Sequence, residues 1–410
     1  MHAIQPGSPH PSTGAPPALA GWAVVMVLFA LTTAVESLSW TQLSAYRPLY
    51  LLELGVSPSG VPGWIAAMSS LGWVLALPLA PFWGVLADRY SRKLVIVRSA
   101  VLEAVIFGGW ALSTTPLMAT VFVSLNGLVL GNTGVMLAVQ ASTTPKQRLA
   151  LAVGMVGAGS PLGRAIGPVL GAFLVHTVDV RGMLLFDAAL SLVMAAVLML
   201  FVDDGEHQRP ADLRVLSLLR GAFDEIISKP LIWRLFLAMS VSTIGLWTML
   251  PYVPIYIARL APNDPVTAVG VVLSSVGLGG AIASPLWGLV MQRAGQVRVL
   301  SLTSVGAFVS LLVAALSHNL YLLTAALIVN SICAAAVLTA SMAVMAMTVS
   351  PERRGAVLGQ ILFPFYVGGL IGPLVGVVAF GLGQPVVFAV AAVLSLGPLV
   401  LLQTMRQRLP

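Results

Sequence analysis

Two ionisable side chains stand deep inside apolar segments of the chain, Glu36 within 19–45 and Arg164 within 149–175. Both lie roughly 21–23 Å from the side where their segments begin, if the segments are helices. A charge at mid-membrane costs about 2.5–3.5 kcal/mol, so such residues usually serve a function. Arginine keeps its charge, whereas a carboxyl group in changing surroundings can bind and release a proton. We interpret Glu36 as a proton-coupling acid and Arg164 as its partner or a substrate anchor; a permanent structural ion pair is the alternative.

Two further acids fall in apolar segments. Glu103 is interpreted as satisfying a neighbouring helix, with a role in transport as the alternative. Asp187, near the end of its segment, is expected to be wet and accompanied by Arg181. The five histidines and Cys333 show no metal-ligand spacing, and the chain has no ATP-binding loop, no HExxH and no Gly-x-Ser-x-Gly motif. We therefore expect no metal, no cofactor and no enzyme, and a single cysteine excludes an internal disulfide.

The composition requires that these residues be positioned by membrane helices. Of 410 residues, 58% are hydrophobic and only 9% are charged, against roughly 25% charged in soluble proteins. A soluble enzyme and a disordered chain are both excluded. The net charge of +7 is assigned to basic residues on cytoplasmic loops and not to nucleic-acid binding.

Twelve apolar segments approach the ~20 residues that a membrane helix needs. If the N-terminus is cytoplasmic, 17 of the 21 lysines and arginines fall on the inner side, which predicts that both termini are cytoplasmic. The predicted fold is all-α, with 12 transmembrane helices in two six-helix bundles. The segments run over 19–45, 61–83, 94–113, 117–141, 149–175, 183–202, 231–258, 266–290, 297–316, 320–348, 355–380 and 386–404.

The segments divide the chain into five parts. A disordered tail, 1–17, precedes the first bundle, 18–202. A cytoplasmic linker, 203–230, contains an amphipathic helix on the membrane surface. The second bundle, 231–404, is followed by a short tail, 405–410.

An internal repeat makes the two bundles alike. Five residues of segment five match five residues of segment eleven at a constant offset of 205. Like-oriented repeats are one way in which transporters are built, with the halves rocking about a central site. The matched residues are Gly154, Gly163, Gly167, Pro168 and Gly171 with Gly359, Gly368, Gly372, Pro373 and Gly376.

The turn between segments two and three reads GVLADRYSRK over 84–93. It resembles the signature loop of the major facilitator superfamily, with Ser91 in place of a glycine. The resemblance implies a cytoplasmic latch in which Asp88 meets the next helix and pairs with basic residues; a plain turn with topogenic charges is the alternative. The gate residues carried over are Gly84, Asp88, Arg89, Arg92 and Lys93.

Segment five, GMVGAGSPLGRAIGPVLGA, is similar to the antiporter motif of the drug–proton exporters in that superfamily. Its small residues either only pack helices tightly or add a proline-weakened bend between the halves. Such exporters usually carry an arginine in span four, where this chain has Asn126 and Asn132 and no basic residue. The missing arginine slightly favours uptake or facilitated diffusion over proton-driven export.

The resemblance implies a central cavity lined by spans one, four, seven and ten. Aromatic and amide side chains there suit an amphipathic or cationic solute, although interfacial aromatic belts explain Trp40, Tyr46 and Tyr252 equally well. The candidate cavity residues are Trp40, Asn126, Trp247, Asn330, Phe363 and Tyr366.

The function that we predict is proton-coupled export of small amphipathic or cationic molecules by alternating access. Uptake or facilitated diffusion of a small metabolite is the alternative, and a non-transporting receptor or embedded enzyme a remote one. The expected partners are the solute, protons and the bilayer of the cell membrane. One chain contains both halves, so a monomer suffices.

Overall fold

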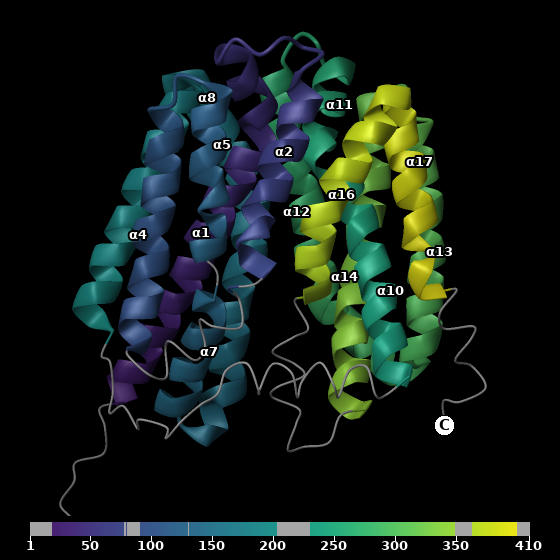
Figure 1. Cartoon of the computed structure of the whole chain (residues 1–410). Coiled ribbons are helices and arrows are strands. Elements are labelled where there is room, and N and C mark those ends of the chain that lie inside the picture. The colour runs from purple at the N-terminus through teal and green to yellow at the C-terminus, as the bar shows by residue number, and fades with distance from the viewer. Residues whose placement is uncertain are drawn as a thin grey trace, which may run out of the picture.

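The computed structural model describes residues 19–77, 79, 91–129, 131–202, 230–348 and 363–399, which are almost entirely helical and contain no strand. The helices run up and down, side by side (Figure 1). Several predicted features lie outside the described residues: the tails 1–17 and 405–410, the linker up to residue 229, and Gly84, Asp88, Arg89 and Gly359.

The first half of the chain forms α1 to α8. These elements are α1 (Leu19–Glu53), α2 (Val61–Val74), α4 (Arg92–Ala111), α5 (Pro116–Ser124), α6 (Asn126–Val129), α7 (Asn132–Thr143), the 3₁₀ turn η1 (Lys146–Arg148) and α8 (Leu149–Phe201). We call this part the N-terminal half.

The second half forms α10 to α17, and we call it the C-terminal half. Its elements are α10 (Pro230–Met249), the 3₁₀ turn η2 (Leu250–Tyr252), α11 (Val253–Leu260), α12 (Pro265–Ala294), α13 (Gln296–Ala315), α14 (Leu320–Thr348), α16 (Phe363–Leu382) and α17 (Gln384–Ser395).

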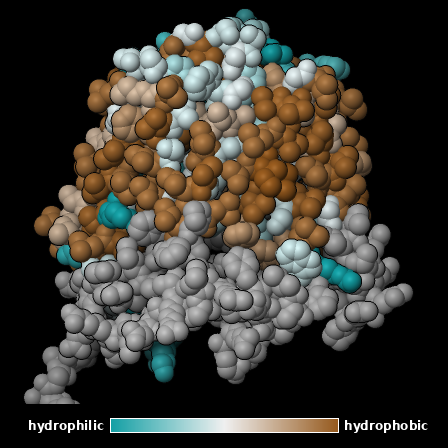
Figure 2. Space-filling view, in the orientation of Figure 1, coloured by the Kyte–Doolittle hydropathy of each residue, from teal (hydrophilic) through white to brown (hydrophobic). Residues whose placement is uncertain are grey.

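Within the described residues, nine helices are long and apolar enough to cross a membrane. One of them, Lys146–Phe201, is 56 residues long and contains two of the segments expected from the sequence. Apolar side chains cover most of the face in Figure 2, with polar ones gathered toward the top. These features confirm an all-α membrane protein.

The helices depart from the expected segments at two places that matter for the site. Segments five and six are joined almost without a loop, because α8 is interrupted only at Asp179, which has φ 69° and ψ −177°. Segment four is divided into α5, α6 and α7, with Gly131 in the left-handed region at φ 97° before α7. Glycine adopts this conformation without the steric penalty of a side chain.

Helix packing follows the internal repeat. In the N-terminal half α1 packs along α8, and in the C-terminal half α10 packs along α16 in the same way. The main contacts between the halves are those of α8 with α12 and of α2 with α16, and α1 also touches α11 and α12. The functional residues therefore lie either inside one half or at these junctions.

The turns after α1, α4, α11, α13 and α16 share one end of the molecule, which is uppermost in Figure 1. The break at Asp179 lies there too, since α8 reverses direction at this residue. Asp264 caps the first turn of α12 at the same end, with its carboxylate accepting the Thr267 N–H at 3.1 Å. We call this end the Asp264 end.

Candidate functional site

Glu36 is held between two helices of the N-terminal half. Its carboxylate Oε2 accepts a hydrogen bond of 2.9 Å from the side-chain amide of Asn132. The side-chain Oδ1 of Asn132 accepts the N–H of Thr133 at 2.8 Å, which turns the side-chain NH₂ group toward Glu36. Gly131 places Asn132 at the first position of α7. The break in segment four thus supplies the donor for this acid.

A second acid lies beside this pair. Glu103 of α4 is 4% exposed and accepts a hydrogen bond of 3.0 Å from the indole N–H of Trp40. The Trp40 ring packs on Phe107 with centroids 5.4 Å apart. Glu103 lies within electrostatic range of both Glu36 and Asp187. Trp40 thus belongs to the interior of the N-terminal half.

Asp187 was expected to be wet, and this expectation is wrong. The side chain is fully buried, and its Oδ1 accepts a hydrogen bond of 3.0 Å from Ser39 on α1. Arg181 donates to the carbonyl oxygen of Ala111 at 3.1 Å. The position of Asp187 near a segment end did not reveal that α1 covers it.

Arg164 and Glu36 are not joined by a recorded hydrogen bond or ion pair, although both belong to described helices. The Arg164 side chain is exposed, and its backbone packs against α12. A Cβ added to Gly277 would lie 2.8 Å from the Arg164 carbonyl oxygen. Arg164 therefore marks the junction of the halves, and Glu36 takes a neutral amide as its partner.

The glycines of the fifth-segment motif face α1 within their own half. A Cβ at Gly163 would meet the Ala34 carbonyl, one at Gly167 would meet Thr41, and one at Gly171 would meet Tyr46. Gly154 has nothing within 4 Å of such a Cβ. Three glycines of the motif thus pack helices closely. The approach between the halves depends on Gly270 and Gly277 of α12.

An aromatic cluster occupies the junction of α2, α10 and α16. The Trp73 ring lies 5.4 Å from Trp247, 5.7 Å from Phe365 and 5.4 Å from Tyr366. A Cβ at Gly369 would collide with the Trp73 indole, so glycine is needed there. Trp247 and Tyr366 were predicted to share a cavity, and Trp73 is the missed member that joins them. Its signal was an aromatic residue within an apolar segment.

The other candidate cavity residues lie apart from this cluster. Phe363 stacks on Phe236 at 6.1 Å. Asn330 of α14 is 6% exposed. Asn126 packs near Gly72 of α2.

Arg92 and Lys93 of the signature loop form the first turn of α4. Ser91, which replaces the usual glycine, precedes them in an extended conformation, and its hydroxyl accepts the Leu94 N–H at 2.9 Å. Serine is a favourable N-cap residue. The serine that replaces the glycine of the signature therefore caps the start of α4.

The halves also meet at the Asp264 end. The Tyr46 hydroxyl donates to the Val266 carbonyl at 3.3 Å, and the Ser274 hydroxyl accepts the Val169 N–H at 3.0 Å. His176 Nε2 lies 3.5 Å from Asp264 Oδ1. Beside these contacts a cavity of about 300 Å³ is lined mainly by apolar side chains of both halves, including Leu49, Val61, Pro254, Val269 and Phe380.

Comparison with known proteins agrees with this architecture. The chain is 27% identical over 336 residues to Multidrug resistance protein MdtG of Proteus mirabilis, covering 81% of this chain and 83% of the relative. It is 24% identical over 332 residues to Multi-drug resistance efflux pump PmrA of Streptococcus pneumoniae, with the same coverage.

Solved structures share the fold at low identity. The nucleoside transporter NupG superposes with a TM-score of 0.76 at 14% identity, covering 93% of this chain and 98% of that one. A bacterial homologue of the human lysosomal transporter Spinster gives 0.75 at 14%, covering 96% and 97%. The family model of the Major Facilitator Superfamily matches residues 17–263 and 263–408. The chain belongs to the Major Facilitator Superfamily of membrane transporters and resembles its multidrug efflux branch.

Proposed function

We propose that this transporter exports small amphipathic or cationic molecules in exchange for protons, with Glu36 as the acid that binds and releases the proton. The observation that supports this proposal most directly is the partly buried Glu36 carboxylate, which is hydrogen-bonded to the neutral side-chain amide of Asn132. No ion pair of Glu36 with a basic residue of the described helices is recorded. An acid without a fixed cation is free to exchange a proton for a cationic solute.

The aromatic cluster supports the solute class. At the junction of the halves, an amphipathic cation would meet the aromatic rings of Trp73, Trp247, Phe365 and Tyr366. Cation–π contacts contribute about 0.5–2 kcal/mol each. A sugar requires more hydrogen-bonding groups than this cluster provides. The multidrug names of the relatives MdtG and PmrA point to the same solute class.

Orientation follows from the basic residues. With the basic loops in the cytoplasm, the Asp264 end faces outside, in the plasma membrane. The hydrogen bonds of Tyr46 and the His176–Asp264 contact then close the outer side, and opening there releases the solute. One chain holds both halves, so a monomer completes the cycle.

The test uses purified protein in liposomes with ethidium, an amphipathic cation, as the probe. We expect an imposed pH gradient to drive ethidium against its concentration gradient in the wild type and not in Glu36→Gln. Glu53→Gln is the matched control, since Glu53 ends the same helix and is exposed. Gradient-driven transport by Glu36→Gln at the wild-type rate would remove Glu36 from the mechanism.

Two further outcomes separate the alternatives. Downhill movement of a nucleoside or other small metabolite by the wild type, unaffected by a pH gradient, would favour facilitated diffusion. Trp73→Ala is expected to weaken ethidium binding by roughly tenfold, the loss of one or two ring contacts. Unchanged ethidium binding by that variant would exclude the aromatic cluster as the solute site.

A further inference from the structure

A second group of buried polar side chains lies where α1 meets α4 and both parts of α8. We call it the buried polar cluster: Ser39, Gln42, Glu103, Asp187 and Ser191. Their exposed fractions are 0%, 0%, 4%, 0% and 1%. Five polar side chains at this burial inside a membrane helix bundle require a reason.

Several atoms of the cluster have no partner among the described residues. Asp187 Oδ1 accepts from Ser39, but Oδ2 accepts from nothing, and the Ser191 hydroxyl and both amide atoms of Gln42 are also unpaired. Ser191 lies one turn beyond Asp187, and Gln42 lies one turn beyond Ser39, so each shares a face with its neighbour. In folded proteins, buried polar atoms without a protein partner commonly bind an enclosed water molecule.

The cluster connects with Glu36. Glu103 lies within electrostatic range of both Glu36 and Asp187. Trp40, which donates to Glu103 at 3.0 Å, stands one turn beyond Glu36 on the same face of α1. Carboxyl groups thus follow one another from Asp187 through Glu103 to Glu36.

Asp187 and Glu103 lie at a similar depth, and Glu36 lies deeper. Asp187 stands eight residues after the break at Asp179, and Glu103 eight residues before the end of α4. Each is therefore about 12 Å from the Asp264 end at 1.5 Å per residue. Glu36 lies seventeen residues before the end of α1, or about 26 Å. Asp187 and Glu103 are nearer the side from which an exporter takes its protons.

Three arginines of the N-terminal half have other partners. Arg47 donates to Ser69 at 2.7 Å, Arg98 to Ser99 at 3.2 Å, and Arg181 to the carbonyl of Ala111. The recorded donors to Asp187 and Glu103 are the neutral groups of Ser39 and Trp40. A buried carboxyl group held by neutral donors is suited to carry a proton.

We propose that the buried polar cluster is a proton route, separate from the solute cavity, in which Asp187 and Glu103 deliver protons through enclosed water to Glu36. A hydronium ion protonates the Asp187 carboxylate and leaves as water. The acid O–H of Asp187 then passes its proton through water to Glu103, and Glu103 passes a proton to Glu36. Each donor returns to the carboxylate form, so one proton moves inward per passage.

A proton fits better than a metal ion. Within the described helices no three His, Cys, Asp or Glu side chains gather closely enough to hold a metal. The inference rests on the proposed function, because Glu36 is the acid that receives the proton. A separate route lets protons enter while the solute occupies the aromatic cluster.

The experiment compares Asp187→Asn, Glu103→Gln and the control Glu53→Gln in liposomes with ethidium. We expect the first two to slow pH-gradient-driven transport by about a hundredfold, the scale of a lost proton-transfer group. Ethidium counterflow without a pH gradient is expected to continue at the wild-type rate in all three. Glu53→Gln is expected to match the wild type in both assays.

A spectroscopic measurement on the wild type is independent of transport. Infrared spectra at neutral pH are expected to contain a band from a protonated carboxylic acid that shifts in D₂O and disappears in Asp187→Asn. A wild type without this band would overturn the proposal. So would a band that disappears when sodium is added, because the cluster would then bind a metal cation.

The transport outcomes separate the two proposals. A wild type that ignores the pH gradient would defeat the proposed function and the route together. A wild type driven by the gradient, with Asp187→Asn and Glu103→Gln unimpaired, would overturn the route alone. Loss of counterflow together with gradient-driven transport would overturn it too, because the acids would then support structure.

Discussion

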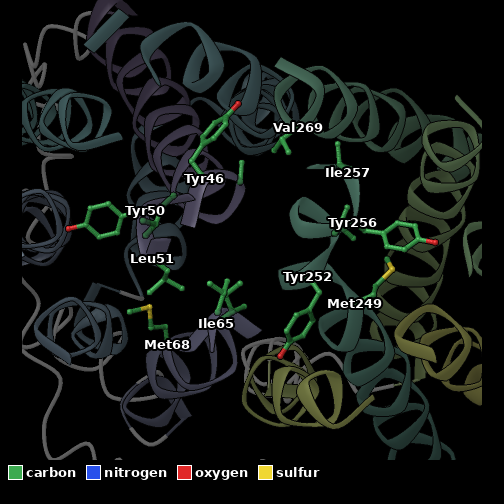
Figure 3. Close-up of a cluster of buried hydrophobic side chains, with 14 of the residues drawn as sticks. Tyr46, Tyr50, Leu51, Ile65, Met68, Met249, Tyr252, Tyr256, Ile257 and Val269 are labelled. Carbon is green, nitrogen blue, oxygen red and sulfur yellow. The ribbon is translucent and has the colours of Figure 1, made fainter. Parts of the chain in front are cut away.

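Tyr46 donates its hydroxyl hydrogen to the carbonyl oxygen of Pro168 at 2.7 Å, joining α1 to α8. Tyr252 donates to Pro373 at the same 2.7 Å, joining η2, which directly follows α10, to α16. In Figure 3 the two tyrosines extend in different directions, each from its own half. Tyr46 differs in also reaching the carbonyl of Val266 across the junction, at 3.3 Å.

These tyrosines offer a matched pair of substitutions. Tyr46→Phe and Tyr252→Phe are each expected to lower the free energy of unfolding by about 1 kcal/mol, since each removes the single hydroxyl hydrogen that is donated to a buried carbonyl oxygen. Thermal unfolding of the purified variants measures this loss. Only Tyr46→Phe is expected to loosen the Asp264 end. Ala258→Cys, placed in a Cys333→Ala background, should then react faster with a maleimide in Tyr46→Phe. Equal labelling in the two variants would contradict a role in closure.

Gly163 permits the close approach of α8 and α1. A Cβ at this position would lie 2.9 Å from the Leu38 nitrogen and would also collide with the Ala34 carbonyl. Gly163→Ala is therefore expected to lower the free energy of unfolding by about 1–3 kcal/mol. Gly154→Ala, with open space around its Cβ, is expected to be neutral or slightly stabilising in a helix. Similar unfolding midpoints for the two variants would refute the packing role of Gly163.

Ser91 caps α4 through its hydroxyl. Ser91→Ala is expected to cost about 1 kcal/mol, and Ser91→Gly only a few tenths. Thermal unfolding midpoints should therefore fall in the order wild type, Ser91→Gly, Ser91→Ala. A midpoint for Ser91→Ala equal to that of the wild type would show that the cap contributes nothing.

Asp264 is expected to make the stability of the protein depend on pH in the acid range. Hydrogen bonds from Thr267, and then the neighbouring His176, hold the pKa of Asp264 below its ordinary value of about 3.9. Because this pKa is lowered in the folded state, the ionised carboxylate stabilises the fold at pH values above the ordinary pKa. This stabilisation is lost as the pH falls through the lowered pKa. Between pH 4 and pH 2, roughly this window, the unfolding midpoint of the wild type should fall more steeply than that of Asp264→Asn. Parallel dependence of the midpoint on pH in the two proteins would count against a stabilising role of the Asp264 carboxylate.

The repeat was readable from the sequence because its physical cause is local. Gly163, Gly167 and Pro168 recur as Gly368, Gly372 and Pro373, since each set must let a neighbouring helix approach. The sequence did not tell which helix that was, and the glycines face α1 and α10, not the opposite half. Packing partners depend on the rotation of each helix, which small residues alone do not fix.

The acids were harder to place for the same reason. Glu36 and Arg164 lie at similar depth, yet depth does not show which face of a helix a side chain occupies. Asp187 was misjudged because its distance from a segment end was known but the cover by Ser39 was not. Asn132 was noted only as part of a span that lacks arginine, although the glycine before it signals a break that can present an amide.

The break at Asp179 is a single residue, so the two parts of α8 follow each other directly. The Asp179 carboxylate accepts the Gly182 N–H at 2.8 Å and so begins the second part of the helix directly after the first. The part of α8 that packs on α12 is therefore joined through one residue to the part that holds Asp187. We expect a movement of one half against the other to reach the acids beside α1 through this connection.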